Sequence, residues 1–433
     1  MKRMLILPAV AMWFAGTVHA QPRPLALAEA VEMARRNAVV VVRAEGAAQN
    51  AGQGVRTALG AFLPSFSLSS GSTYQLGATG NTRIENGQIV TVARDPWSSS
   101  LGVSANLLLF DGGARLFNLR EARFSRVSSD VDEDLAHWQA ALAAKQAFFD
   151  VLAARETQVA AAAQLEQADR QRWVAIERTR AKAATRSDSL RAEIQVRAAR
   201  LAVLEAATAR ASADAALARA VGSLESVTAA AIDSTEPALA ADDAALIAMT
   251  EDAPSVRGAR AKLDASRSAQ KGSWTAYLPS VSAIWAHTGS GAVGPGYWGP
   301  NHLDYAGTMR LSLSFPLFNQ FQRESQVVQA GAAVRVAEAE LRDAQLAARQ
   351  ALTDGLGQYR AAAHRVASQL ATVDAAIEDL RVMSQRYSVG GSTLLDVLAS
   401  QTQLDQARRD LIRARYDQRI AKAQLEALVG RDL

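Results

Sequence analysis

The chain of 433 residues contains no cysteine, and this absence removes several kinds of chemistry. Without cysteine there are no disulfides, thiolate metal sites, cysteine nucleophiles or lipid anchors on cysteine. After Ala20 no stretch reaches about 18 consecutive apolar residues, so no transmembrane helix is expected. The chain also has little excess of one sign of charge. The 47 basic and 43 acidic residues are interspersed, which argues against a nucleic-acid-binding surface.

Glycine and proline are absent from Ala114 to Val221, although the chain has 27 glycines and 11 prolines. Inside a helix glycine costs about 1 kcal/mol and proline about 3 kcal/mol relative to alanine. The run therefore predicts very long helix, and at 1.5 Å per residue roughly 65 residues would reach about 100 Å. That length suits a tube standing off a membrane. The hydrophobic share of 49% excludes a disordered chain.

The N-terminus has the pattern of a secretory signal peptide. Lys2 and Arg3 precede the apolar stretch 4–16, and the small residues Val18 and Ala20 mark a cleavage site. The apolar core is too short for a membrane anchor. We therefore expect residues 1–20 to be removed and the mature chain to cross an inner membrane.

The mature sequence contains two copies of one plan. Leu63-Pro64 recurs as Leu278-Pro279, and Asp188 recurs as Asp396 at an offset of 208. A repeat this long indicates duplication of a half-molecule rather than a solenoid. The predicted division is a first repeat over 21–222, with strands at about 61–110 and a helical hairpin at about 111–222; a linker over 223–242; and a second repeat over 243–433, with strands at about 276–318 and a helical hairpin at about 319–430.

Each half contains two segments with the period of a strand, and uncharged, aromatic-rich sequence covers 57–82, 96–110 and 272–303. Apolar side chains alternate with polar ones from Leu101 to Leu109 and from Met309 to Phe315. Loops at 77–95 and 289–301 separate the strands. Aromatic residues concentrate here, as in the girdles of outer-membrane strands, although a buried sandwich core is the alternative. Four strands cannot close a membrane barrel, so several chains must contribute strands to one barrel.

The helical segments have the spacing of coiled coils. Apolar positions repeat as an a/d seam through Val366, Leu370, Val373, Ile377, Leu380, Ser384 and Tyr387. Gly390-Gly391 interrupts the second helical region, and the offset of 208 places the matching turn at Lys182-Ala183. The sequence thus predicts two antiparallel helical hairpins.

These motifs resemble the TolC-like outer membrane efflux protein family. The most specific segment is Arg386–Leu398, with the sequence RYSVGGSTLLDVL, followed by Gln403-Leu404 and Ala407. The Leu-Pro entry to each first strand and the segments 109–113 and 316–318 at strand exits are also similar to the family. The similarity extends over essentially the whole mature chain.

The resemblance implies a mainly α-helical fold with a membrane β-barrel portion. Three chains would form a 12-stranded barrel in the cell outer membrane and a long periplasmic helical barrel. It also implies docking to a periplasmic adaptor (membrane fusion) protein and, through it, to an inner-membrane transporter. Family channels export small molecules, metal ions or polypeptides. The expected function is therefore a passive exit duct of a tripartite efflux or secretion system.

The resemblance places the pore entrance near the second helical turn. Acidic residues there ring the entrance of family channels, which points to Asp396 and, by the offset, to Asp188. A solvated or helix-capping aspartate is the alternative. This chain departs from the family at two positions: Ala399 replaces a second acidic residue, and Ser392 replaces a basic residue that latches the closed entrance in some members. The residues predicted at the entrance are Asp396, Asp188 and Ser392.

The two turns themselves are the expected adaptor contacts. Val389, Gly390 and Gly391 match the family's adaptor-contacting turn, whereas the first half has Ala181, Lys182 and Ala183 in the corresponding positions. Basic residues crowd this first turn at Arg178, Arg180, Lys182, Arg186 and Arg191. They could form a solvated basic face, or they could face an acidic adaptor hairpin or an anionic cargo.

Arg310 lies on the polar face of a predicted strand and is expected in the barrel lumen, because a lipid-facing arginine would cost roughly 2–4 kcal/mol. Enzymatic motifs are missing: the mature histidines form no i, i+4 pair and no glycine-rich phosphate loop follows a strand. We expect no enzyme, cofactor or metal site, and give His287 and His302 no more than a loop role. The competing prediction is a periplasmic structural coiled-coil protein without a channel.

Overall fold

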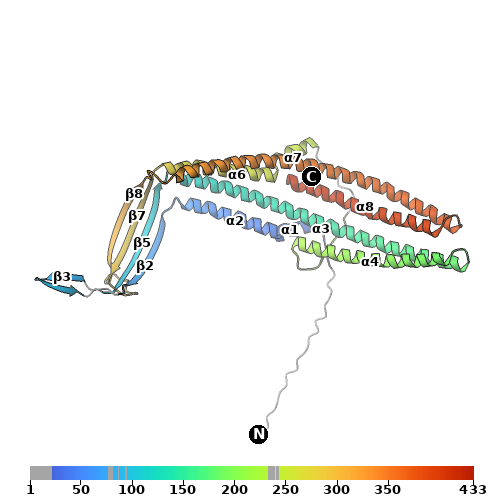
Figure 1. The fold of residues 1–433 in the computed structure, drawn as a ribbon, viewed down its shortest axis with the longest axis horizontal. Helices are drawn as coiled ribbons and strands as arrows, with labels where there is room; N and C mark the ends of the chain where they lie inside the picture. Colours follow the sequence, from blue (N-terminus) through green and yellow to red (C-terminus); the bar gives the residue numbers. More distant parts are fainter. Residues whose placement is uncertain (1–21, 77–80, 86, 93–94, 233–238, 240–242) are drawn as a thin grey trace, which may run out of the picture.

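The computed structural model describes residues 22–76, 81–85, 87–92, 95–232, 239 and 243–433, so the predicted signal peptide at 1–20 lies outside the described residues. The molecule is elongated, with a β-sheet at one end and two helical turns at the other (Figure 1). The two long helices α3 and α7 connect these ends. Each has 67 residues and extends for roughly 100 Å at 1.5 Å per residue.

The element order repeats the same plan twice, which confirms the predicted fold class. In the first half the plan consists of α1 (Leu27–Asn37), α2 (Val39–Gly60), β2 (Ser65–Tyr74), β5 (Trp97–Phe110), α3 (Ala114–Arg180) and α4 (Arg186–Val221). In the second half it consists of α5 (Asp243–Thr250), α6 (Pro254–Ser273), a 3-10 turn (Trp274–Tyr277), β7 (Ser280–Gly291), β8 (Asp304–Ser314), α7 (Gln322–Ser388) and α8 (Leu394–Val429).

Four short strands appear where the sequence pattern predicts none. β3 (Asn81–Glu85) and β4 (Gln88–Val92) form a hairpin inside the predicted loop at 77–95, next to the Asn-Gly pair that favours hairpin turns. β6 (Val227–Ala229) lies within the predicted linker at 223–242 and pairs in parallel with β1 (Arg23–Leu25). Strands of three residues are too short to show a period in the sequence.

The main sheet has the strand order β2-β5-β7-β8, and every neighbouring pair is antiparallel. Its outer strands β2 and β8 each pair on one side only among the described residues. Both are exposed along nearly their whole length. The sheet is therefore open at two edges, and each edge presents unpaired backbone groups.

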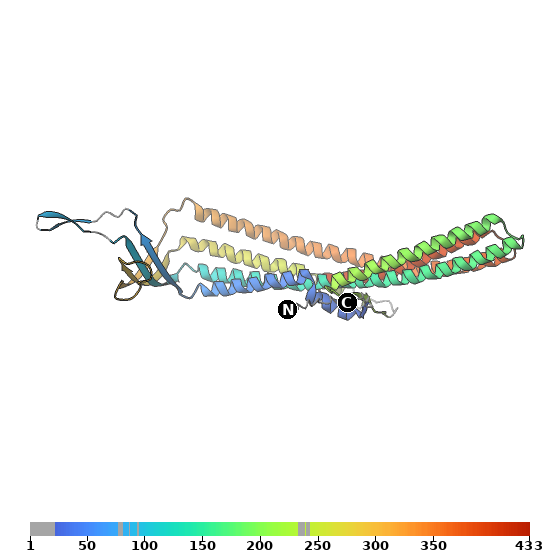
Figure 2. The same ribbon diagram turned by 90° about the horizontal axis from the view of Figure 1, so that it is seen from below.

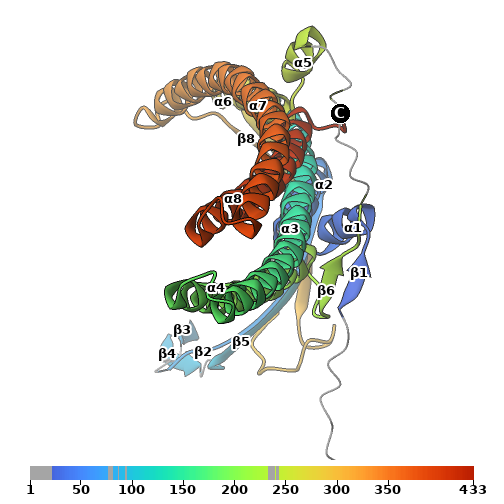
Figure 3. The same cartoon turned by 90° about the vertical axis from the view of Figure 1, so that its right-hand side faces the viewer.

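The long helices lie side by side along an arc when the molecule is seen end-on (Figure 3). Toward the turns, α3 packs against α4 and α8, and α8 packs against α7. Toward the sheet, α3 packs against α2 and α6, and α6 packs against α7. Each level of the wall is thus four helices wide, with α1, β1 and β6 on its convex side.

The largest core cluster joins both halves near the middle of the molecule. Phe148 and Leu152 of α3 pack there with Leu217 of α4 and Tyr416 of α8. Gly222 ends α4 at a φ of +68°, and a Cβ there would lie 2.7 Å from the Cβ of Asn37. The left-handed conformation and this close approach explain why glycine follows the last helical turn.

Candidate functional site

The two helical turns lie together at the end of the molecule opposite the sheet (Figure 2). Both turns have the same backbone hydrogen bonds. The N–H of Ala183 donates to the carbonyl of Arg178 at 2.8 Å, and the N–H of Gly391 donates to the carbonyl of Arg386 at 2.7 Å. Both bonds are those of a Schellman motif, which satisfies the last carbonyls of a helix. The equivalent atoms are 208 residues apart, so the duplication extends to the geometry of the turns.

The first turn keeps this geometry without a glycine. Gly390 has a φ of +80°, and Lys182 at the equivalent position has a φ of +60°. Left-handed backbone is uncommon for a residue with a Cβ and costs roughly 1–2 kcal/mol. Lys182 in place of glycine therefore strains the backbone of the first turn but does not change the type of turn.

Asp188 and Asp396 are both caps of the helices that follow the turns. The N–H of Thr185 donates to Asp188 Oδ2 at 3.0 Å, and the N–H of Thr393 donates to Asp396 Oδ2 at 2.8 Å. In return each threonine hydroxyl accepts the N–H of its aspartate. Each pair is a capping box at the start of α4 or α8.

The capping geometry changes the interpretation of Asp396. Hydrogen bonds from the Thr393 N–H and hydroxyl lower the pKa of this exposed carboxyl, and nearby Arg386 lowers it further. Asp396 is thus held as a carboxylate at the far end of the molecule. The helix-capping alternative is observed, and it leaves one carboxylate oxygen for other contacts.

An arginine from the first half holds the second half at the turns. Arg178 donates to the backbone carbonyl of Tyr387, and its guanidinium carbon lies 4.4 Å from the Tyr387 ring centroid. Burial raises the pKa of the Tyr387 hydroxyl, with Asp188 contributing and Arg178 opposing. Tyr387 also packs with Leu394 and Val397 in a cluster that joins α3 and α4 to α7 and α8.

The rest of the second turn divides between anchored and exposed residues. The Ser392 hydroxyl donates to the carbonyl of Met383 at 3.1 Å and so fastens the turn to α7. Val389 is 83% exposed. Ser392 therefore stabilises the turn within its own half, whereas Val389 is available to another molecule.

The basic residues of the first turn separate into two groups. Arg178 contacts Tyr387, and Arg180 pairs with Glu177 at 2.7 Å. Within the described part of the chain no ion pair engages the other three, which are exposed: Lys182, Arg186 and Arg191. The positive charge that remains available is therefore smaller than the sequence indicates.

At the opposite end, the register of the sheet separates two chemical faces. One row crosses the sheet as Phe66, Ala105, Trp285 and Met309. The next row contains Ser65, Asn106, Ile284 and Arg310. Directly opposed residues share a face, so Arg310 lies on the face rich in serine, threonine and asparagine, away from the aromatic face.

His287 belongs to the aromatic face of the sheet. Its ring stacks with Tyr305 at 5.5 Å and with Trp285 at 6.4 Å between centroids. His302 contacts the Tyr297 ring edge-on at 5.4 Å. Both histidines have aromatic neighbours, which the sequence did not indicate.

One group of potential ligands escaped the sequence analysis. Glu45 of α2 lies beside Glu133 and His137 of α3. The sequence does contain a sign of this group, because Glu133 and His137 lie at i, i+4 on one predicted helix. This pair includes only one histidine, so the absence of histidine pairs at i, i+4 does not exclude it.

Comparison with known proteins identifies the family. The model for outer membrane efflux proteins matches residues 30–223 and 248–431. The chain belongs to the outer membrane efflux protein family. Protein CyaE of Bordetella pertussis is 27% identical over 408 residues, covering 89% of this chain and 80% of CyaE.

Solved structures have the same fold. CusC superposes with a TM-score of 0.79 at 14% identity, covering 94% of this chain and 92% of CusC. The outer membrane protein VceC of Vibrio cholerae gives a TM-score of 0.76 at 17% identity, covering 94% of this chain and 96% of VceC. These identities are low, so the structural likeness describes the fold.

Family membership confirms the predicted resemblance, the outer membrane location and the function as an outer membrane efflux channel. It also decides against the competing prediction of a periplasmic coiled-coil protein without a channel. Among the described helices, none is long and apolar enough to cross a membrane.

Proposed function

We propose that three copies of this efflux protein close into one tube, which is a passive exit duct through the outer membrane. The open sheet carries the proposal. Its four strands have two unpaired edges and one polar and one apolar face. Within lipid such edges must be paired, and three sheets would supply twelve strands in antiparallel alternation.

The helical wall supports the same arrangement. Near the turns its order is α4, α3, α8 and α7, so α4 and α7 are the free sides. The free side of α4 exposes an apolar stripe whose members are each more than half exposed: Leu190, Ile194, Leu201 and Leu204. On α7 the predicted heptad seam faces α8, because Val366 packs with Leu411 and Ala414. A neighbouring copy would cover the apolar stripe of α4.

The duplication predicts which residues meet between copies. Within one chain the hydroxyl of Tyr416 on α8 donates to Glu156 on α3 at 2.6 Å. Subtracting 208 from 416 and adding 208 to 156 gives Thr208 on α4 and His364 on α7, both exposed. We expect Thr208 of one copy to lie beside His364 of the next.

Cysteine cross-linking tests this contact cleanly because the natural chain has no cysteine. Thr208→Cys with His364→Cys should give a covalent trimer in outer membranes after mild oxidation. Each single variant is the matched control and should give no trimer. The proposed ring would be contradicted if the double variant reaches the outer membrane in the same amount as the wild type but remains monomeric after oxidation.

The turns then form the periplasmic end of the duct. We infer that Val389, Gly390 and Gly391, with Ala181, Lys182 and Ala183, contact a periplasmic adaptor. That adaptor would link the duct to an inner-membrane transporter, which supplies the energy. The exposed Val389 and the available charge of Lys182 and Arg186 support a contact here.

The cargo would pass two sets of charges. Three copies of Asp396, Asp188 and Ser392 would surround the entrance, and the lowered pKa of Asp396 keeps that group ionised. Three copies of Arg310 would project into the barrel lumen from its polar face. The proposal assigns no catalytic residue, because transport through such a duct needs no chemical step.

A further inference from the structure

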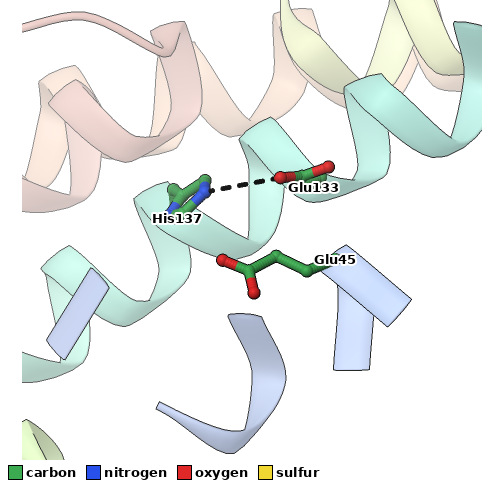
Figure 4. A group of neighbouring side chains, drawn as sticks. All are labelled: Glu45, Glu133 and His137. Carbon is green, nitrogen blue, oxygen red and sulfur yellow. Dashed lines mark ion pairs between the residues drawn. The ribbon is translucent and has the colours of Figure 1, made fainter. Parts of the chain in front are cut away.

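Three potential metal ligands meet between α2 and α3, far from both the turns and the sheet. Glu133 and His137 lie one helical turn apart on α3, and Glu45 reaches them from α2 (Figure 4). One ligand atom from each residue lies within 4.8 Å of those of the other two. All three side chains are half-buried, so they are accessible to an ion from solution.

The other charged groups lining the adjoining pocket have partners of their own. Arg36 donates to Glu32 at 2.6 Å, and Arg257 lies 3.7 Å from Asp134. Arg35 lies over the ring of Trp138, 5.1 Å from its centroid. No arginine or lysine of the described chain thus pairs with the two carboxylates of Glu45 and Glu133.

His137 offers an imidazole nitrogen as the third potential metal ligand. His137 Nε2 lies 4.0 Å from a Glu133 carboxylate oxygen, and its Nδ1 is shielded from solvent without a hydrogen-bond partner in the described structure. Two carboxylates would repel each other here if no cation were present. An ion with charge +2 would balance both of them.

We propose that Glu45, Glu133 and His137 bind a Zn²⁺ ion. Zinc accepts mixed imidazole and carboxylate ligands, and three protein ligands leave its fourth position for water. Magnesium and calcium prefer all-oxygen sites, so the imidazole favours zinc. The ion would fasten α2 to α3 close to the break between α1 and α2, and it is independent of the proposed duct.

Equilibrium dialysis of the untagged, full-length protein in detergent against Zn²⁺ tests the site. We expect one tightly bound ion per chain, and at least tenfold weaker binding by His137→Gln and by Glu45→Gln. Glu32→Gln is the matched control, because Glu32 lines the same pocket but is paired with Arg36. That control should bind zinc as the wild type does.

A second readout separates binding from folding. Zinc should raise the melting temperature of the wild type and of Glu32→Gln, and should leave that of His137→Gln unchanged. The site is refuted if His137→Gln and Glu45→Gln retain full zinc binding, if the wild type binds none, or if Mg²⁺ or Ca²⁺ at equal concentration displaces zinc.

Discussion

Replacing Lys182 with glycine should stabilise the first helical turn. Lys182 and Gly390 occupy equivalent positions with φ values of +60° and +80°, and the surrounding hydrogen bonds are the same. Only the first turn carries a Cβ in this conformation. Lys182→Gly therefore removes strain without removing a contact of the turn.

The size of the effect follows from two opposing terms. Left-handed backbone costs a residue with a Cβ roughly 1–2 kcal/mol. Glycine removes this cost, but it also destabilises the closed turn by about 0.5–1 kcal/mol, because glycine has more conformational freedom than lysine in the opened state. The net gain is about 0.5–1 kcal/mol, which corresponds to a roughly two- to fivefold change in the opening equilibrium.

Hydrogen–deuterium exchange at the turn measures this equilibrium locally, which matters because a trimer of the proposed size is not expected to unfold in one step. The N–H of Ala183 should exchange about two- to fivefold more slowly in Lys182→Gly than in the wild type. Lys182→Ala is the matched control: it removes the charge, keeps the Cβ and should leave the exchange rate unchanged. Equal slowing in both variants would refute the strain argument and assign the effect to charge.

Four other perturbations have defined outcomes. Asp396→Asn should speed amide exchange at the start of α8, since it removes the carboxylate that accepts from Thr393; Asp410→Asn on the same helix is a control. The lowered pKa of Asp396 means that this cap stabilises the helix at neutral pH and is lost only as the pH falls below the ordinary aspartate value of 3.8 and through the still lower folded pKa, which exchange followed from neutral pH down past 3.8 should show. Arg310→Gln should shift the reversal potential of bilayer-inserted channels toward cation selectivity, whereas Arg126→Gln on α3 should not. Equal reversal potentials of Arg310→Gln and the wild type would contradict a position of Arg310 in the lumen. Reversing Lys182 and Arg186 to glutamate should reduce capture of the periplasmic adaptor by cross-linking from the turns, and undiminished capture would leave this basic group as a solvated face.

The duplication made much of the fold predictable. The offset of 208 located the first turn at a segment without glycine, and the structure has a Schellman turn there. It also related Asp188 to Asp396, which prove to cap equivalent helices. Local signals suffice for such features because caps and turns depend on residues within a few positions of one another.

Contacts between distant segments were not predictable in the same way. Arg178 belongs to a run of basic residues in the sequence, yet it contacts Tyr387 because the two halves pack together. Glu45 likewise meets His137 only because α2 lies beside α3. Neither contact leaves a periodic signal, since each depends on how separate helices pack.

Conductance across a planar lipid bilayer tests the exit duct most directly. Purified wild-type protein should insert as a trimer and produce discrete conductance steps of uniform size, because in the proposed trimer three of the four-stranded sheets would enclose one water-filled passage. A bilayer that stays silent in the presence of protein recovered as a soluble periplasmic species would contradict the proposed channel.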